Sequence, residues 1–190
     1  MSLRTKFPIL SQNDKWEYIS KHFKCPRIHL FLIKHIYNTQ MQISKNFNLS
    51  EFIKSGFADS YGIDNTPDTI SKANICRLVT EVLQPIRDEF GEPIIINSCY
   101  RCERVNRGVG GSKNSDHKYG CAADIRTESN LLHDNMRLWN CIMQMVNDGK
   151  IKCRQIVFEH GRRKIGPQWI HISINHENNP YKENQILYIK

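Results

Sequence analysis

The sequence predicts an α+β domain in which helices flank a mostly antiparallel sheet. Apolar residues recur at helical spacing between residues 70 and 90 and again between residues 132 and 146. Short runs at 94–96, 122–125, 155–159 and 169–174 predict strands, and the first of them is β-branched throughout. Helical patterns come first and strand patterns follow with one helix between them, an order that favours the α+β class.

Local signals predict where the first helices begin and end. Asn48 followed by Glu51 is a capping-box pattern, so we expect a short helix to start there. Thr66-Pro67 predicts the start of a long helix, Pro85 a kink near its end, and Gly91 its termination. The apolar positions of this helix are Ile70, Ala73, Ile75, Leu78, Val82, Leu83, Ile86 and Phe90.

The predicted strands follow the long helix. Ile94–Ile96 is bounded by turn-forming residues and predicts a buried strand that runs towards Tyr100. A loop rich in glycine and small polar residues, 108–115, leads into the second strand. The amphipathic helix at 132–146 is closed by Gly149, and a basic loop joins the last two strands.

With 190 residues the chain is long enough for one well-buried core. We divide it into an N-terminal extension of unknown role, residues 1–44, and a main domain, residues 45–190. Segments around Trp16–Phe23 and His29–Tyr37 predict short helices in the extension, which would either cap the main domain or bind a partner.

The net charge of +8 and the pI near 9.2 favour anionic partners. Nucleic acid, an anionic membrane surface and anionic cell-wall polymers all satisfy this condition, so charge does not decide among them. The sequence shows no helix-turn-helix, aromatic stacking motif or zinc-finger spacing, and we therefore expect no specific nucleic-acid binding.

Seven cysteines form no dense framework and their odd number prevents complete pairing, which favours a reducing compartment during folding. The first forty residues lack the apolar run of a secretory signal, and no apolar run approaches ~20 residues. We expect a monomer without a membrane span, made in the cytoplasm, that reaches any external substrate only after release through a permeabilised membrane.

Three residues in the second half of the chain are candidate metal ligands. His117 precedes a glycine turn, Asp124 lies in the strand that follows, and His171 lies on a later strand. Two imidazoles and one carboxylate would hold zinc and leave its fourth position to water, as in catalytic sites. The same residues also fit a loop histidine, a strand-capping aspartate and a hydrogen-bonded half-buried histidine, so spacing alone leaves both interpretations open.

Several motifs follow one another between residues 47 and 174. Their occurrence together in this order is more specific than the occurrence of any single motif. Together they resemble the zinc D-alanyl-D-alanine carboxypeptidases and related phage endolysins, which share their fold with hedgehog signalling domains. The matching segments are Phe47–Phe52, Gly62–Pro67, Leu83–Arg87, Ser98–Arg101, Gly110–Asp124, Gln155–Glu159 and Trp169–Ser173.

The resemblance implies a role for each matching residue. His117, Asp124 and His171 match the family's zinc ligands. Arg101 matches an arginine thought to hold a substrate carboxylate, for which a planar guanidinium is suited. Ser115 matches a small polar residue near the metal that helps to orient substrate.

Two positions, 159 and 168, bear on the identity of the general base. Many relatives carry an acidic residue three positions before the last histidine ligand, but here that position is Gln168, which cannot accept a proton at neutral pH. Glu159 is the better candidate because it ends a strand that could face His171 across an antiparallel pair; the alternative is an exposed strand-end carboxylate. His160 is either a substrate contact or a solvated loop histidine.

The resemblance implies a zinc-dependent peptidase that cleaves D-amino-acid-containing stem peptides of peptidoglycan. It would act as a D-Ala-D-Ala carboxypeptidase or as an endolysin-type endopeptidase, and the missing signal peptide and the basic charge favour the second. The basic run Arg162–Lys164 is either a solvated face or a contact for an anionic wall polymer. The alternative function is a non-catalytic, zinc-bearing module that binds cell wall or a partner protein.

Overall fold

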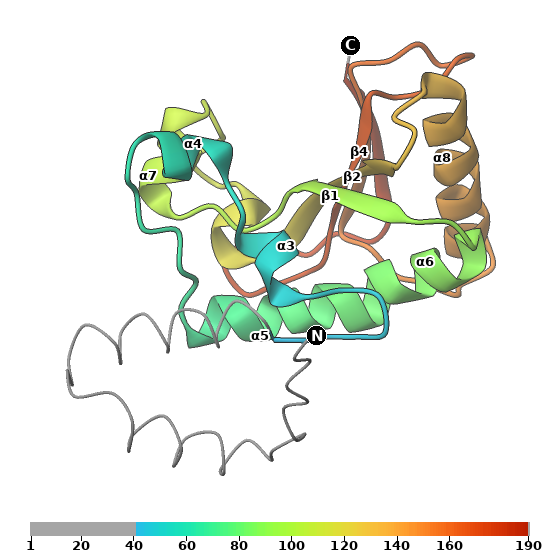
Figure 1. The fold of residues 1–190 in the computed structure, drawn as a ribbon. Helices are drawn as coiled ribbons and strands as arrows, with labels where there is room; N and C mark the ends of the chain where they lie inside the picture. The colour runs from blue at the N-terminus through green and yellow to red at the C-terminus, as the bar shows by residue number, and fades with distance from the viewer. Residues whose placement is uncertain (1–40, 190) are drawn as a thin grey trace, which may run out of the picture. The chain divides into compact units, whose positions relative to one another are not determined.

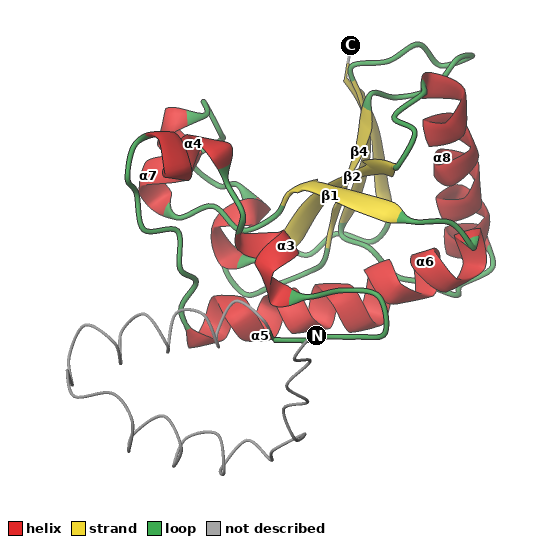
Figure 2. Cartoon of the chain, in the orientation of Figure 1, coloured by secondary structure: helices red, strands yellow, loops and turns green. Residues whose placement is uncertain are grey.

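The computed structural model describes residues 41–189 and confirms the predicted α+β class (Figure 1). Within these residues one five-stranded sheet has the order β1-β2-β4-β3-β5, drawn in yellow in Figure 2. Its pairs are antiparallel except β3 with β5, which is parallel. The strands are β1 (Ile94–Ser98), β2 (Ala122–Thr127), β3 (Gln155–Glu159), β4 (Trp169–Ser173) and β5 (Gln185–Ile189).

Helices precede the sheet in the chain and are also inserted between its strands. None in the described part is long and apolar enough to cross a membrane. They are α3 (Leu49–Ile53), α4 (Gly56–Ser60), α5 (Thr69–Leu78), η1 (Val79–Leu83), α6 (Gln84–Phe90), α7 (Glu103–Gly108), η2 (Asp116–Tyr119) and α8 (Leu132–Asn147); η1 is a π-helix and η2 a 3₁₀-helix.

The long helix starts later than its sequence predicts. Asp68 is the N-cap, and its Oδ1 accepts a hydrogen bond of 2.7 Å from the backbone N–H of Ser71. Pro67 therefore lies before the cap instead of at the first helical position, so the prediction of a start at Thr66-Pro67 was wrong by two residues. The predicted end is confirmed, because Gly91 adopts the left-handed conformation with φ of 77°.

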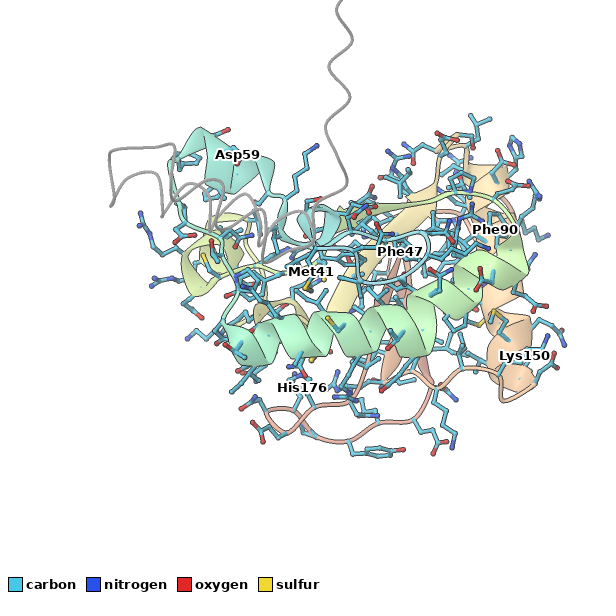
Figure 3. The ribbon with its side chains drawn as sticks, turned by 60° about the horizontal axis from the view of Figure 1, so that its bottom comes forward. Met41, Phe47, Asp59, Phe90, Lys150 and His176 are labelled. Atoms are coloured by element: carbon cyan, nitrogen blue, oxygen red, sulfur yellow. The ribbon has the colours of Figure 1, made fainter. Side chains whose placement is uncertain are left out.

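The predicted kink lies beside a π-helical turn of the long helix. Pro85 has no N–H to donate to the preceding turn, and Val79–Leu83 just before it forms η1. The helix changes direction between α5 and α6, and its second half ends at Phe90 (Figure 3). Both halves of the helix contribute residues to the core.

The two faces of the sheet differ in character. One face packs against α8 and the long helix, where the ring of Trp139 meets that of Phe158 edge-on at 5.2 Å between centroids. The other face carries Asp124, His171 and Val157, which are paired across β2, β4 and β3. The buried residues of the helix-covered face are Ala123, Ile125, Ile156, Phe158, Ile170 and Ile172.

Some elements differ from the prediction. Strand β1 lies at the sheet edge and of Ile94–Ile96 only Ile94 is buried, so the expectation of a buried strand was wrong. Helices α4 and α7 are too short to show a helical apolar period, and β5 is largely exposed and depends on β3 for its pairing.

The predicted helices at 16–23 and 29–37 lie outside the described residues, as does Cys25. The backbone N–H of Leu49 donates to the carbonyl of Met41 at 2.8 Å, so the first described residues are bonded to the start of α3. The six described cysteines are free thiols. Burial raises the pKa of Cys121 and Cys153 to about 12 and also raises that of Cys99, which opposes redox chemistry there.

Candidate metal centre

The side chains of His117, Asp124 and His171 converge and are called the ligand cluster below. His117 Nε2 lies 3.2 Å from His171 Nδ1, and Asp124 Oδ1 lies 3.3 Å from the first atom and 2.9 Å from the second. In residues 41–189 no other group of three histidine, cysteine or acidic side chains brings its ligand atoms together in this way. The predicted ligands therefore form one candidate metal site.

The sheet register and one glycine account for this convergence. Asp124 on β2 lies directly opposite His171 on β4, so both side chains leave the same face. His117 comes from η2, which Gly120 ends in the left-handed conformation with φ of 69°. A Cβ at Gly120 would lie 2.5 Å from the carbonyl oxygen of Ser71, so only glycine fits this close turn.

The tautomer of His117 suits metal binding. Its Nδ1–H donates to the carbonyl oxygen of Cys99 at 2.6 Å, which leaves the lone pair of Nε2 directed at the cluster. Burial lowers the pKa of His117 by more than the neighbouring Asp124 raises it. The ring is therefore held neutral, the form in which imidazole binds metals.

Asp124 is held as a carboxylate with one oxygen free for the cluster. Burial acts to raise its pKa, but the charges and hydrogen bonds of His117 and His171 outweigh that effect and the pKa is lowered. Arg101 Nη2 donates to Oδ2 at 2.7 Å, while Oδ1 faces the two imidazoles. Arg101 thus leaves a single oxygen for a metal.

These donors fit a catalytic metal site. Two imidazole nitrogens and one carboxylate oxygen are a ligand set of catalytic zinc, and tetrahedral bonds of about 2.0–2.1 Å place neighbouring ligand atoms about 3.3–3.4 Å apart. The observed separations of 2.9–3.3 Å are close to that spacing. The ligand side chains are only 4%, 12% and 13% exposed, so little rearrangement is needed to bind the ion.

Arg101 contacts a candidate metal ligand directly. Besides the bond to Asp124, its Nε donates to Ser98 Oγ at 2.8 Å, and its backbone N–H donates to the carbonyl of His117 at 3.1 Å. The guanidinium is fixed beside the centre by these contacts. Its role in binding a substrate carboxylate stays a prediction.

Glu159 lies on the same sheet face as His171 but is not its direct partner. The residue opposite Glu159 is Trp169, and the residue opposite His171 is Val157. Glu159 is thus a diagonal neighbour of His171, within the reach of a long side chain. Burial, followed by the charge of Asp124, raises the pKa of Glu159, and its side chain is 17% exposed. A carboxyl with a raised pKa suits proton transfer near neutral pH.

The other two predicted site residues are His160 and Ser115, and His160 also lines a pocket with Gln168, Leu132 and Phe158. His160 is exposed, with its ring 4.9 Å from that of Trp169 and its Nε2 3.7 Å from Glu159 Oε2. Ser115 caps η2, and its carbonyl accepts a bond of 3.2 Å from the N–H of Lys118. The substrate contacts predicted for His160 and Ser115 stay predictions.

Gln168 lines a pocket with Leu132 of α8 and Phe158, which belong to the helix-covered side of the sheet. The candidate ligands leave the opposite face. This placement agrees with the chemical argument that Gln168 is not the base.

A second cluster beside η2 was not predicted from the sequence. Asp116 Oδ2 pairs with Arg154 Nη1 at 2.8 Å, and its Oδ1 lies 2.9 Å from His176 Nε2 and accepts a hydrogen bond from the Asn179 amide. We call these four residues the Asp116 cluster. The Arg154 and His176 partners lie 38 and 60 residues from Asp116, so no local spacing reveals them.

The Asp116 cluster supports the segment that carries His117. The ring of Tyr119 on η2 lies 4.8 Å from that of His176, and Asn74 of α5 donates to the carbonyl of Tyr119 at 2.9 Å. The side chains of Asp116, His176 and Arg154 are 4%, 3% and 6% exposed. Buried polar contacts therefore tie η2 to the C-terminal segment and to α5.

Comparison with known proteins identifies the family. A search of curated proteins found no match. A family model described as peptidase M15 matches residues 45–160, which include His117, Asp124 and Glu159; His171 lies beyond the matched range and joins the site through the sheet. Since the match covers more than half of the chain, the protein belongs to the peptidase M15 family of metallopeptidases.

Proposed function

We propose that this metallopeptidase uses zinc to hydrolyse the D-amino-acid-containing stem peptides of peptidoglycan. The observation that carries the proposal is the convergence of two imidazole nitrogens and one carboxylate oxygen within 3.3 Å of one another in a member of this family. Three protein ligands around zinc leave one position for water or substrate.

His117, Asp124 and His171 would hold the metal, which when bound polarises the scissile carbonyl and lowers the pKa of water. Glu159 takes a proton from the attacking water and passes it to the departing amine. Its raised pKa and its place on the same sheet face as His171 support this role. Arg101 orients Asp124 and, as the resemblance implies, an acidic group of the substrate.

The bond that is cut defines two versions of this function. A carboxypeptidase removes the terminal D-alanine, and an endolysin-type endopeptidase cuts within the stem peptide. The net charge of +8 would favour contact with anionic wall polymers, which supports the endolysin version. In this version the enzyme acts on the wall after release through a permeabilised membrane.

The test is incubation of the zinc-loaded full chain with purified peptidoglycan, with and without a chelator, followed by mass spectrometry of the fragments. We expect D-alanine or stem-peptide fragments that disappear with the chelator and return when zinc is added. Hydrolysis that survives complete metal removal would reject the proposal. Stoichiometric zinc without hydrolysis would instead support the non-catalytic module.

A further inference from the structure

A cavity of about 500 Å³ lies beside strand β1. Residues Ile95–Ser98 form one wall, α4 contributes Phe57, and α7 contributes Val105 and Val109. Because β1 is an edge strand, its outer backbone groups have no strand neighbour among the described residues. The cavity is therefore bordered by the kind of surface that an extended peptide can lie along.

Two residues of the cavity lining are bonded to the candidate metal centre. Ser98 and Arg101 line the cavity, and both belong to the hydrogen-bond chain that ends on the ligand Asp124. In the sheet register Ser98 lies opposite Asp124, and Ile95 lies opposite Arg126. Side chains of such pairs leave the same face, so Ser98, Ile95 and Arg126 share a face with the metal ligand Asp124.

The charged side chains that line the cavity are all cationic. They are Lys54, Arg101 and Arg126, and the lining contains no aspartate or glutamate. Arg101 is paired with Asp124, whereas among residues 41–189 Lys54 and Arg126 have no acidic partner within salt-bridge distance. Two positive charges beside the cavity are thus uncompensated.

Arg126 is held in place without being neutralised. Its Nε donates to Asn97 Oδ1 at 2.9 Å, and its Nη1 donates to the carbonyl of Thr127 at 2.8 Å. Both acceptors are neutral, so the guanidinium keeps its positive charge for a ligand. Lys54 follows α3 and is exposed at the cavity wall.

The cavity also offers apolar contact. Phe57 and Val105 line it, and Val109 is 46% exposed. A peptide with a carboxylate on one residue and apolar groups on its neighbours would satisfy both kinds of lining. A neutral peptide would leave the cations of the cavity without a partner.

We infer that this cavity binds a carboxylate-bearing segment of the substrate peptide on one side of the scissile bond, with Lys54 and Arg126 as the residues that select the carboxylate. The inference rests on the proposed peptidase function for the position of the scissile bond. Beyond that function, it assigns acidic peptides as the substrate class and two specificity-determining residues outside the metal centre.

The experiment uses fluorescent peptides that end in D-Ala-D-Ala and carry one glutamate, placed at each upstream position in turn, with glutamine in the matched peptide. Binding to the zinc-loaded full chain is measured by fluorescence anisotropy immediately after mixing, and cleavage is followed separately by mass spectrometry. The variants are Lys54→Gln, Arg126→Gln and the double variant. Lys152→Gln and Arg77→Gln serve as matched controls because both side chains are exposed and lie outside the cavity.

At one glutamate position we expect binding about tenfold tighter than that of the glutamine peptide, a preference reduced about threefold by either single variant and removed in the double variant. The preference should weaken with added salt, and Lys54→Glu should reverse part of it. Melting temperatures establish that each variant is folded.

The inference is overturned if no glutamate position binds more tightly than its glutamine match, or if the preference persists in the folded double variant. Cleavage of the peptides without tighter binding of any glutamate peptide rejects the cavity assignment and leaves the peptidase function intact. A preference that depends on Lys54 and Arg126 without any cleavage supports the cavity assignment and rejects the peptidase function.

Discussion

Two neighbouring clusters combine aspartate and histidine, yet only one of them can hold a metal ion. In the ligand cluster three lone-pair atoms converge within 3.3 Å, and Arg101 takes only the outer oxygen of Asp124. In the Asp116 cluster Arg154 takes one carboxylate oxygen and the Asn179 amide and His176 share the other. A buried guanidinium supplies the positive charge there, so a cation would be repelled.

The comparison shows that residue types near one another in sequence do not define a metal site. Asp116 and His117 are adjacent, but their side chains enter different clusters. The pKa of Asp116, like that of Asp124, is lowered, since hydrogen bonds from His176 and Asn179 and the charge of Arg154 outweigh the effect of burial. A lowered carboxyl pKa therefore accompanies both a metal site and a structural ion pair.

The sharpest test of the comparison removes one histidine from each cluster. His171→Ala should weaken zinc binding by on the order of a thousandfold or more and abolish hydrolysis, because two ligands do not hold a catalytic zinc. His176→Asn should retain one zinc per chain. Metal content after dialysis, measured by mass spectrometry, checks both. Equal loss of zinc from the two variants would refute the distinction between the clusters.

The next largest effect should come from Glu159→Gln. Loss of the proposed base should lower kcat about a hundredfold to ten-thousandfold while zinc content is unchanged, because Glu159 is not a ligand. Glu177→Gln, at an exposed position, is the matched control. Steady-state hydrolysis and metal analysis together check this prediction, and near-normal turnover would move the base to another group.

Asp116→Asn should act on stability and not on the metal ligands themselves. It breaks the buried pair with Arg154, at a cost of about 3 kcal/mol in the free energy of unfolding. Urea unfolding of the chelator-treated protein measures this cost. Arg77→Gln, at an exposed pair, should change the same quantity by less than about 1 kcal/mol.

Asp116→Asn also tests how the free energy of unfolding depends on pH. Because the folded-state pKa of Asp116 is lowered, the unfolded chain takes up a proton at a higher pH than the folded chain. The stability that Asp116 contributes is present above the ordinary aspartate pKa of about 3.9 and is lost as pH falls through the folded value. Wild type should therefore lose stability more steeply than Asp116→Asn below about pH 4; equal slopes would contradict the pKa shift.

Arg101→Gln should weaken the metal site less than the loss of a ligand does. Asp124 would lose the partner of its outer oxygen, which should weaken zinc affinity about tenfold to a hundredfold. Arg104→Gln, on the exposed side of α7, is the control. Competition with a zinc indicator dye gives the affinity. An unchanged zinc affinity with a raised KM would assign Arg101 to substrate alone.

The sequence by itself determined the elements whose signals are local. The backbone N–H of Asn48 donates to Glu51 Oε1 at 2.7 Å as its capping pattern predicts, and Gly91 and Gly149 follow the predicted helices in left-handed conformations. The residue types of the ligand cluster and the strand that carries Asp124 were also predicted from the sequence. These features depend on a few neighbouring residues, so the chain specifies them without reference to the rest of the fold.

Only the tertiary structure decided which polar side chains contact one another. The register that places Asp124 opposite His171, the bond from Arg101 to Asp124 and the pairing of Asp116 with Arg154 join residues 47, 23 and 38 positions apart. Helix α7 and strand β5 likewise depend on neighbours that are distant in sequence. Such contacts form when all elements pack at once, and a one-residue change of register would move Asp124 to the opposite face of the sheet.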